Sequence, residues 1–593
     1  MSDEPYVKGG SFLLGEVDPQ TVFTPEDFSD EHRMVMDTAR EFTDKEVMPV
    51  REKINELDYD VIKGLLKEAG GLGLLGVEIS EKHGGLDMGK VAAVVIAEAI
   101  GKAGSFPVTL GAHSGIGTLP IYYFGNDAQK DKYLPDLVKG EKVAAFCLTE
   151  PNAGTDALSA KTKAVLSKDK KHYVINGTKQ WITNGGIADV FVVLARTEDD
   201  KLTAFIAERG FGGITSGEEE KKMGIKGSST TVINLDDVKV PAENMLGSQG
   251  EGVKIFLSIL NLGRAKLAAG CMGACKDAIT QTIQYTTQRE QFGKPLNQFG
   301  LIQEKLANMA VRTCVSESAI YRAAGLLQEF HDSIDKSADD AQDQLKKSIA
   351  EYAVECSILK VFVSEALDYV ADEGVQCFGG YGFSCEYPME GIYRDSRINR
   401  IFEGTNEINR LLIPGMLMRR SMKGELPLAA AAQATLKEMS ELPSLSEETG
   451  EMLEREKKLV VTTKKAALLA SGAGMQKFGK ALQDEQELLR MVGDSIMDTF
   501  VLESAVLRAL KIAANAGEEA AQPYVDVATV FAAQAAAAID ARMKECAAAV
   551  ADGDELRILL MAFRRFCKYV PGNVKETRRK IAGKMIEKGE YVI

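Results

Sequence analysis

The stretch that decides the fold is His172 to Gly186, H-Y-V-I-N-G-T-K-Q-W-I-T-N-G-G. Its β-branched and aromatic residues are typical of strands, and the Asn176-Gly177 dipeptide is a strong hairpin-turn signal. Similar short runs rich in Val, Ile, Phe and Thr fill residues 146–245 and are separated by turn residues. We therefore predict a β insert with a hairpin turn at Asn176-Gly177.

The sequence on both sides of this insert has helical periodicity. Ser29 is a predicted helix N-cap, and Val35, Ala39 and Phe42 follow it at helical spacing. The predicted fold class is therefore mainly α with a β insert. The predicted domains are an N-terminal helical domain (1–145), a middle β domain (146–250), a C-terminal helical-bundle domain (251–420), a linker (421–450) and an extra helical domain (451–593).

The composition excludes several classes of function. Hydrophobic residues make up 45% and charged residues 26% of the 593 residues, which is typical of a globular protein. The net charge of −15 gives no electrostatic footprint for nucleic acid. The cysteines and histidines have no metal-ligand spacing; we interpret Cys271 and Cys275 as packing thiols and expect no metal. A Rossmann domain is excluded because no strand–G-x-G-x-x-G–helix unit is present.

Three segments carry candidate chemistry, each with a competing structural interpretation. Residues 147–156, C-L-T-E-P-N-A-G-T-D, enter a loop that offers N–H groups and hydroxyls to a ligand, or that forms a satisfied turn. Trp181, the only tryptophan, either lies in the core or stacks on a planar ring. Glu403 follows the apolar pair Ile401-Phe402. If that pair is buried, desolvation raises the pKa of Glu403 toward that of a general base; otherwise Glu403 is a surface residue before a helix.

Five strings together resemble the acyl-CoA dehydrogenase family. They are A-F-C-L-T-E-P-N-A-G-T-D (145–156), I-N-G-T-K-Q-W-I-T-N-G-G (175–186), R-E-Q-F-G-K (289–294), C-F-G-G-Y-G-F (377–383) and I-F-E-G-T-N-E-I (401–408). They occur in the family's order and spacing, and the extra region most resembles the branch of the very-long-chain acyl-CoA dehydrogenase and the dehydrogenase-like complex I assembly factor. The resemblance implies an N-terminal helical domain, a middle β-barrel-like domain and a C-terminal four-helix domain.

The resemblance also implies a function. The family oxidises an acyl-CoA thioester to a trans-2-enoyl-CoA with FAD, in fatty-acid β-oxidation, and passes the electrons to electron-transferring flavoprotein. Glu403 corresponds to the catalytic base. Some relatives place the base directly before a family arginine, but that position here is Gly263, before Arg264. Glu403 is therefore the only candidate base.

The expected FAD site is shared between copies of the chain, so the resemblance implies a homodimer or larger homo-oligomer. Arg289, Gln291 and Phe292 correspond to residues that reach the FAD of a neighbouring subunit. The full set of implied FAD-binding residues is Phe146, Leu148, Thr149, Gly154, Thr155, Trp181, Ile182, Thr183, Arg289, Gln291, Phe292, Gln376, Gly379, Gly380, Thr405 and Glu407. The implied substrate-binding residues are Thr155, Asn261, Arg264 and Gly404, although Asn261 replaces a frequent Asp.

The acyl chain length is indicated by small residues. Gly115, Gly117 and Thr118 correspond to the floor of the acyl pocket and would leave it deep, although Pro120 departs from the glycine of the very-long-chain type. Long-chain substrates are therefore favoured. Two alternatives stay open: an acyl-CoA oxidase, because oxygen access is not visible in a sequence, and a non-catalytic assembly or scaffold protein, because such relatives can retain the glutamate.

Residues 452–475 form a predicted basic amphipathic helix. Such a helix can lie on an anionic membrane surface; the competing interpretation is a helix packed on its own protein. The acidic N-terminus has no signal-peptide pattern. We therefore expect a bacterial cytoplasmic protein, membrane-associated if this helix binds lipid, and a mitochondrial one if the chain is a processed form.

Overall fold

In the computed structural model, which describes residues 6–439 and 449–593, the N-terminal part of the chain is helical. Ser29 caps the first helix as predicted, because its Oγ accepts a hydrogen bond from the His32 N–H at 3.2 Å. A π-helical segment, Ala112–Gly117, joins α5 to α6. The helices are α1 (Asp30–Phe42), α2 (Arg51–Asn55), α3 (Tyr59–Gly71), α4 (Gly89–Ile100), α5 (Phe106–Gly111), α6 (Leu119–Phe124) and α7 (Asp127–Val138).

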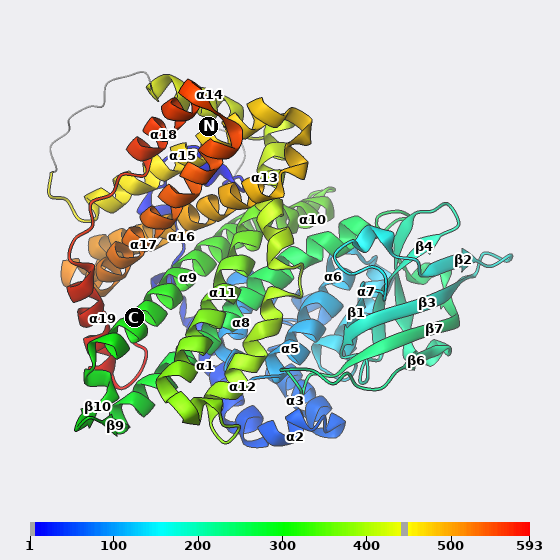
Figure 1. Ribbon diagram of the computed structural model, residues 1–593. Helices are drawn as coiled ribbons and strands as arrows, with labels where there is room; N and C mark the ends of the chain where they lie inside the picture. Colours follow the sequence, from blue (N-terminus) through cyan, green and yellow to red (C-terminus); the bar gives the residue numbers. More distant parts are fainter. Residues whose placement is uncertain (1–5, 440–448) are drawn as a thin grey trace.

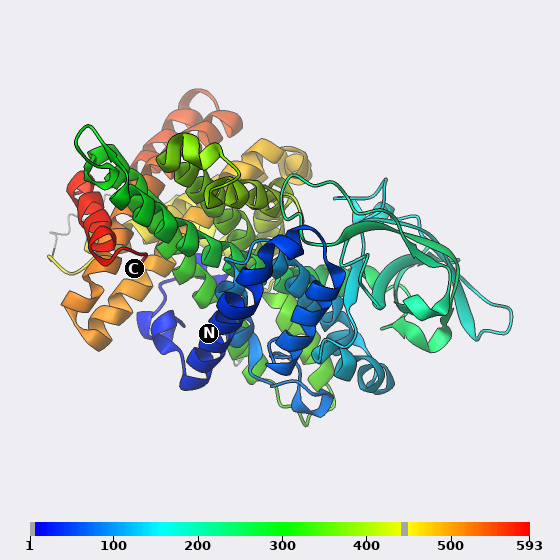
Figure 2. The same cartoon turned by 90° about the horizontal axis from the view of Figure 1, so that it is seen from below.

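The β insert is one sheet that projects from the helical body, on the right of Figure 1. Its strands are β1 (Ala144–Cys147), β2 (Lys163–Leu166), β3 (His172–Thr183), β4 (Val190–Thr197), β5 (Leu202–Glu208), β6 (Ile214–Ser216), β7 (Thr230–Pro241) and β8 (Met245–Leu246). The order is β6-β7-β3-β2-β4-β5-β8, and β1 pairs with β4 in parallel. The sheet also lies to one side of the helices in the view from below (Figure 2). The end of β3 lies against them, because Asn184, directly after it, donates to the Thr109 carbonyl on α5.

The predicted hairpin turn at Asn176-Gly177 was wrong. β3 continues through both residues, and its register against β7 shifts between Ile175 and Gly177, so the dipeptide forms a β-bulge. Gly177 lies directly on Thr162, whose Oγ1 would be 2.4 Å from an added Cβ. The turn that opens β3 instead occupies residues 167–171, where Lys170 has a φ of 58°.

The next part of the chain is a helical bundle in which α8, α9, α11 and α13 pack together. A two-stranded hairpin, β9 (Glu290–Gln291) and β10 (Lys294–Pro295), follows α8 at the end of the bundle opposite the sheet (Figure 1). The helices are α8 (Gly252–Gln288), α9 (Gly300–Asp332), α10 (Ala341–Glu351), α11 (Ala353–Phe378), α12 (Pro388–Ser396) and α13 (Asn406–Met422).

The last part of the chain packs helices on the outer side of this bundle. They are α15 (Glu454–Phe478), α16 (Gln486–Ala516), α17 (Glu518–Val550), α18 (Gly553–Phe566) and α19 (Val574–Lys588). α16 contacts α9 and α13. The stretch 421–450 was expected to be a linker, but it contains a helix, α14 (Leu428–Met439), which packs on α15. Residues 440–448 of the stretch lie outside the described ranges.

The apolar side of α15 faces the protein itself. Leu459, Val460 and Leu469 are buried. Lys464 is also buried, donates a hydrogen bond to the Gly15 carbonyl at 2.7 Å and pairs with Glu503. The membrane-binding prediction for 452–475 is therefore replaced by its alternative, a helix packed on its own protein. Two described helices, α8 and α17, are apolar and long enough to cross a membrane, but 72% of the apolar window of α8 is buried in the protein.

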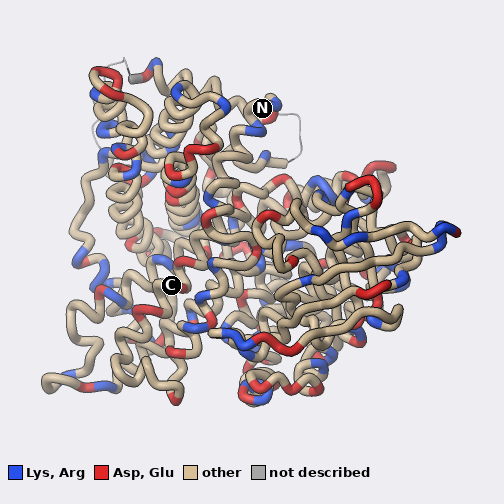
Figure 3. Tube along the Cα trace, turned by 45° about the vertical axis from the view of Figure 1, so that its right-hand side comes forward, with Lys and Arg blue, Asp and Glu red and all other residues tan. Residues whose placement is uncertain are grey.

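Ion pairs whose basic members are buried join the N-terminal segment, the bundle and the last helices. Arg508 on α16 pairs with Glu317 on α9 at 2.6 Å and with Glu26 at 2.8 Å. Lys511 on α16 pairs with Asp27 at 2.6 Å and donates to the Val22 carbonyl at 2.7 Å. Elsewhere, acidic and basic residues are interspersed along the trace (Figure 3).

Candidate active site

Glu403 lies in a tightly held loop that ends where α13 begins. Its backbone is left-handed, with φ 59°, a conformation that a non-glycine residue keeps only when its surroundings fix it. Arg264 Nε donates to the Glu403 carbonyl at 3.1 Å, and Asn409 Nδ2 donates to the Gly404 carbonyl at 2.8 Å. Thr405 caps α13, because its Oγ1 accepts from the Ile408 N–H at 3.3 Å. These contacts fix the direction of the Glu403 side chain.

The carboxyl group of Glu403 has a pKa near neutral pH, so both its charged and its neutral forms are populated there. The residue keeps some exposure, but its Oε2 atom is buried and has no hydrogen-bond partner. Desolvation raises the pKa of Glu403 to about 7, although the positive charges of Arg264 and Lys360 oppose the rise. The pKa direction is the one expected for a general base.

Gly263 is the residue against which this carboxylate packs. A Cβ added to Gly263 would lie 2.8 Å from Glu403 Oε2. Position 263 and Glu403, the two positions at which the resemblance allows a base, therefore lie next to each other. In this chain the glycine on α8 leaves the room that the carboxylate from the α13 loop fills.

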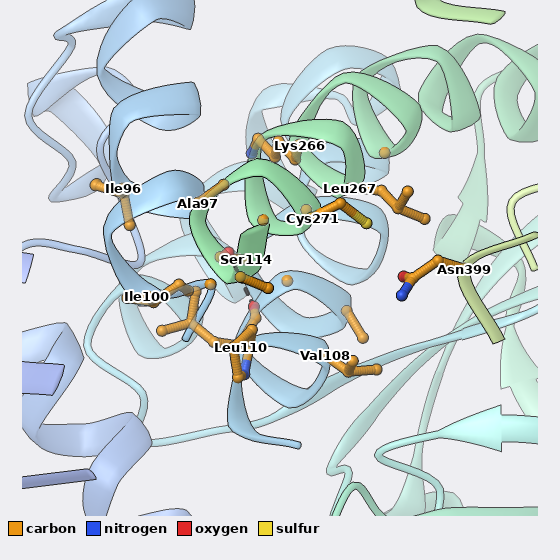
Figure 4. A pocket seen from close by; sticks show the side chains of 18 of the residues that line it. Ile96, Ala97, Ile100, Val108, Leu110, Ser114, Lys266, Leu267, Cys271 and Asn399 are labelled. Atoms are coloured by element: carbon orange, nitrogen blue, oxygen red, sulfur yellow. Dashed lines mark hydrogen bonds between the residues drawn. The ribbon is translucent and has the colours of Figure 1, made fainter. Parts of the chain in front are cut away.

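A cavity of about 200 Å³ opens beside Glu403 (Figure 4). It follows α8 from Gly263 to Asp277, which is roughly 21 Å along the helix axis. Its walls come from α4, α5, the π-helical segment, α8 and the segment before Glu403. Apolar and small residues dominate the wall. The lining residues labelled in Figure 4 are Ile96, Ala97, Ile100, Val108, Leu110, Ser114, Lys266, Leu267, Cys271 and Asn399.

The small residues expected on the pocket floor have different roles. Gly115 lines the cavity. Gly117 packs against β1 instead, because an added Cβ would lie 2.8 Å from Ala144 Cβ, and Thr118 is buried with its Oγ1 donating to a backbone carbonyl. The sequence interpretation missed Gly111, which lines the cavity and has no atom within 4 Å of an added Cβ.

The end of β3 brings one expected FAD residue to the cavity. Thr183 lines the cavity together with Glu403, and Asn184 fixes this end of β3 by donating to the Thr109 carbonyl at 3.0 Å. Trp181 has φ 58° and is 57% exposed, so its indole is available to stack rather than part of the core. Ile182 is buried in the β core, which leaves only its backbone available to a cofactor.

The 147–156 loop lies next to β3 but outside the residues that line the cavity. Phe146, Leu148 and Thr149 are half-buried, whereas Gly154 and Thr155 are exposed. The loop is anchored by a buried ion pair that the sequence interpretation missed, Glu150 to Lys179 on β3 at 2.8 Å. Their separation in the sequence gave no local signal of this pair.

A second cavity gathers the residues expected at the phosphate and adenosine end of FAD. Arg289, Gln291, Gly379 and Gly380 all line it, beside Tyr285 and Tyr381 among other residues. Phe292 is 95% exposed at the hairpin tip, and Gln376 is exposed on α11 outside this lining. Thr405 and Glu407 lie instead at the start of α13, close to Glu403.

The expected substrate residues are also separated. Arg264 and Gly404 lie beside Glu403, whereas Thr155 lies on the β domain. Asn261 is buried and uses both polar groups internally: its Oδ1 accepts from Arg264 Nη1 at 3.1 Å, and its Nδ2 donates to the Ile349 carbonyl at 3.1 Å. Its geometry therefore orients Arg264.

These residues fit a flavin dinucleotide. Trp181 offers an exposed aromatic face for a planar ring. Gly379, with φ 62°, and Gly380 have no atom within 4 Å of an added Cβ, so their backbone is open to close approach. Among the described residues, no carboxylate lies within ion-pair distance of Arg289, so its guanidinium is available for a pyrophosphate.

Family models match most of the chain. The acyl-CoA dehydrogenase N-terminal domain matches residues 29–141, the middle domain 145–238, and two models of the acyl-CoA dehydrogenase C-terminal domain match 250–418 and 462–565.

Similar proteins cover the extra helices as well. A probable acyl-CoA dehydrogenase of Bacillus subtilis is 48% identical over 99% of this chain and 98% of its own. The very long-chain specific acyl-CoA dehydrogenase of rat mitochondria is 37% identical over 80% of this chain and 73% of its own. The crystal structure of an acyl-CoA dehydrogenase complexed with FAD from Bacillus anthracis superimposes with a TM-score of 0.96, at 48% identity, over 99% of this chain and all of that one.

Proposed function

Because the chain belongs to the acyl-CoA dehydrogenase family, whose cofactor is FAD, we propose that it oxidises long-chain acyl-CoA thioesters to trans-2-enoyl-CoA in fatty-acid β-oxidation. The observation that carries this proposal is the buried, unpartnered Oε2 of Glu403 at the head of an apolar cavity. A carboxylate placed there has a near-neutral pKa and no competing protein partner, as a base for a weakly acidic carbon requires.

In the proposed reaction, Glu403 takes the α-proton onto its carboxylate while the β C–H bond breaks and the α,β double bond forms. Bound FAD supplies the two-electron acceptor for the β-hydride. The N–H of Glu403 would donate to the thioester oxygen and stabilise the negative charge that develops there. Arg264 and Asn409 hold the backbone that carries both groups. The apolar walls exclude water, which keeps the base desolvated.

The dimensions of the cavity support a long acyl chain. Its path of roughly 21 Å along α8 accommodates an extended long chain, and its apolar wall removes that chain from water. Gly111 and Gly115 keep the floor open. We therefore propose that palmitoyl-CoA is a better substrate than octanoyl-CoA.

The distance from Glu403 to the second cavity supports a homo-oligomer of at least two copies. Gly263, beside Glu403, and Gln288, which precedes Arg289 of the second cavity, are on one helix, roughly 38 Å apart. This is more than one extended dinucleotide spans, so the flavin end beside Glu403 and the residues of the second cavity would serve different FAD molecules. The exposed Phe292 and the β9–β10 hairpin would then reach the neighbouring subunit.

We further propose electron-transferring flavoprotein as the electron acceptor and the bacterial cytoplasm as the location. The close similarity to Bacillus proteins over the full chain supports the location. If oxygen admitted after the anaerobic test below reoxidised the flavin rapidly, an acyl-CoA oxidase would be favoured instead, and absence of any reduction would favour a scaffold protein.

The test is the visible absorbance of the purified, flavin-containing protein during anaerobic addition of octanoyl-CoA or palmitoyl-CoA. We expect the flavin to bleach, faster per unit of substrate with palmitoyl-CoA. Glu403→Gln should keep the flavin spectrum but lose bleaching. For the wild type, kcat/KM should fall about tenfold for each pH unit below about 7, because only the ionised base acts. Undiminished bleaching by Glu403→Gln would contradict the assignment.

A further inference from the structure

Lys360 is a buried cation that the reaction described above does not use. It lies on α11 with 0% of its surface exposed. Its Nζ donates a hydrogen bond to Asn406 Oδ1 at 2.7 Å, and within the described parts of the chain no carboxylate oxygen lies within ion-pair distance. A buried ammonium without an ion-pair partner is costly, so a structure that keeps one has a compensating reason.

The charges around Lys360 identify that reason. The groups that face it are Cys271 and Arg264 on α8, and Glu403 and Glu407 around the start of α13. Glu403 is in the complementary situation, a buried carboxylate oxygen without a partner, and its two electrostatic neighbours are Arg264 and Lys360. Arg264 directs its hydrogen bonds to the Glu403 carbonyl and to Asn261 rather than to the carboxylate. Lys360 is therefore a counter-charge that acts on Glu403 without bonding to it.

Lys360 also fixes the position of Asn406, which follows the catalytic loop (the loop that carries Glu403). Its partner Asn406 follows Thr405 at the start of α13 and donates to Ser364 Oγ at 3.1 Å and to Glu365 Oε1 at 3.0 Å. Glu365 in turn forms two hydrogen bonds of 2.8 Å with Arg410. The ammonium thus fixes the first residue of the helix whose preceding loop carries the base.

We propose that Lys360 is a positioning residue for the dehydrogenation, which anchors Asn406 behind the catalytic loop and supplies the positive charge that keeps Glu403 ionised and available as a base. This inference rests on the proposed function for its link to turnover, but its electrostatic part concerns the protein alone. Desolvation lowers the pKa of Lys360 to about 8, while Cys271 and Glu403 favour its charged form. The residue thus remains charged near neutral pH.

Two neutral variants and one control test the inference. Lys360→Gln removes the charge but keeps a donor for Asn406, and Lys360→Met removes both. Ser364→Ala breaks a neighbouring bond to Asn406 without changing charge. The first measurement is the infrared C=O band of protonated Glu403, identified by its loss in Glu403→Gln, followed against pH in the flavin-containing protein. The second is the pH profile of flavin reduction by palmitoyl-CoA.

Removal of the charge should move the midpoint of the Glu403 titration upward by about one pH unit in both neutral variants, and the acid limb of the reduction rate should move with it. At pH 7 the reduction rate should fall about fivefold, because the ionised fraction of Glu403 drops from about one half to about one eleventh. Ser364→Ala should leave the midpoint in place. If either folded, flavin-containing neutral variant titrates like the wild type, the inference is wrong; if the infrared shift occurs but no protein is reduced, the proposed function fails instead.

Discussion

Replacing Gly263 with alanine adds one methyl group beside the carboxylate of Glu403, the proposed base. The added Cβ would lie 2.8 Å from Glu403 Oε2 and 3.2 Å from its Cδ, whereas ordinary contact begins at 3.4 Å. The oxygen must therefore retreat by about 0.6 Å, the difference between 2.8 and 3.4 Å. Ile116 Cγ2, 3.2 Å from the same Cβ, limits any rotation away from the carboxylate.

The expected result separates catalysis from stability. A displacement of 1 Å at reacting atoms can cost about 100-fold in rate, so a retreat of this size should slow flavin reduction roughly tenfold. The same substitution in the interior of α8 favours the helix by about 0.5–1 kcal/mol, because alanine loses less backbone entropy than glycine. The variant should thus unfold at an unchanged or slightly higher temperature while it reacts more slowly.

The assay is stopped-flow reduction of the flavin by palmitoyl-CoA, with thermal unfolding measured on the same samples. Gly583→Ala is the matched control, since Gly583 lies inside α19 with no atom within 4 Å of an added Cβ. It should gain the same helix stability and keep the wild-type rate. A Gly263→Ala enzyme that reduces its flavin at the wild-type rate would refute the placement of the Glu403 carboxylate.

Three further substitutions have defined outcomes. Gly111→Leu fills open space in the cavity, so kcat/KM for palmitoyl-CoA should fall roughly tenfold or more while that for octanoyl-CoA is retained; equal losses would place the acyl chain elsewhere. Arg508→Leu removes the buried partner of Glu317, which keeps its pair with Lys276, and of Glu26, whose side chain is 34% exposed; it should lower the free energy of unfolding by about 1.5–3 kcal/mol in calorimetry. Arg557→Leu, from a pair with side chains 80% and 90% exposed, should change it little. Burial lowers the pKa of His113 to about 4, so between about pH 6.5 and 4 the unfolded chain binds this proton more readily and the free energy of unfolding falls as the pH falls. His113→Gln should therefore lose about 3 kcal/mol less of its free energy of unfolding on acidification than the wild type. Identical acid profiles in denaturant titrations would contradict this.

Local patterns in the sequence predicted the local parts of this structure. The cap at Ser29, the apolar spacing of α1 and the β insert depend on neighbours a few residues away, and the structure shows all three. The desolvation of Glu403 was one of two alternatives that the sequence left open. The structure shows the raised pKa, but not through burial of the preceding pair, since Ile401 is 48% exposed and Phe402 is half-buried. By contrast, Asn176-Gly177 has a strong turn preference, but continuous pairing of β3 with β7 outweighs it.

Interactions between distant segments could not be predicted from the sequence. The pairs Glu150–Lys179 and Lys360–Asn406 join residues on different elements, and nothing in the sequence around either member indicates its partner. The amphipathic pattern of 452–475 indicates that one face must be covered, but a membrane and a neighbouring helix satisfy that pattern equally well. Only the packing of α15 on α14 and α16 distinguishes the two.

The ion pairs and hydrogen bonds between the first and last parts of the chain have a consequence for biosynthesis. Glu26 is separated from its partner Arg508 by 482 residues, and the Gly15 and Val22 carbonyls bind Lys464 and Lys511, which follow them by 449 and 489 residues. At 5–20 residues per second, a ribosome needs roughly 25 to 100 s to complete that interval. During this time the N-terminal segment has left the ribosome without its final contacts. Its docking must therefore be a late event, and chaperones or proteases that act on the nascent chain would meet this segment before it is protected.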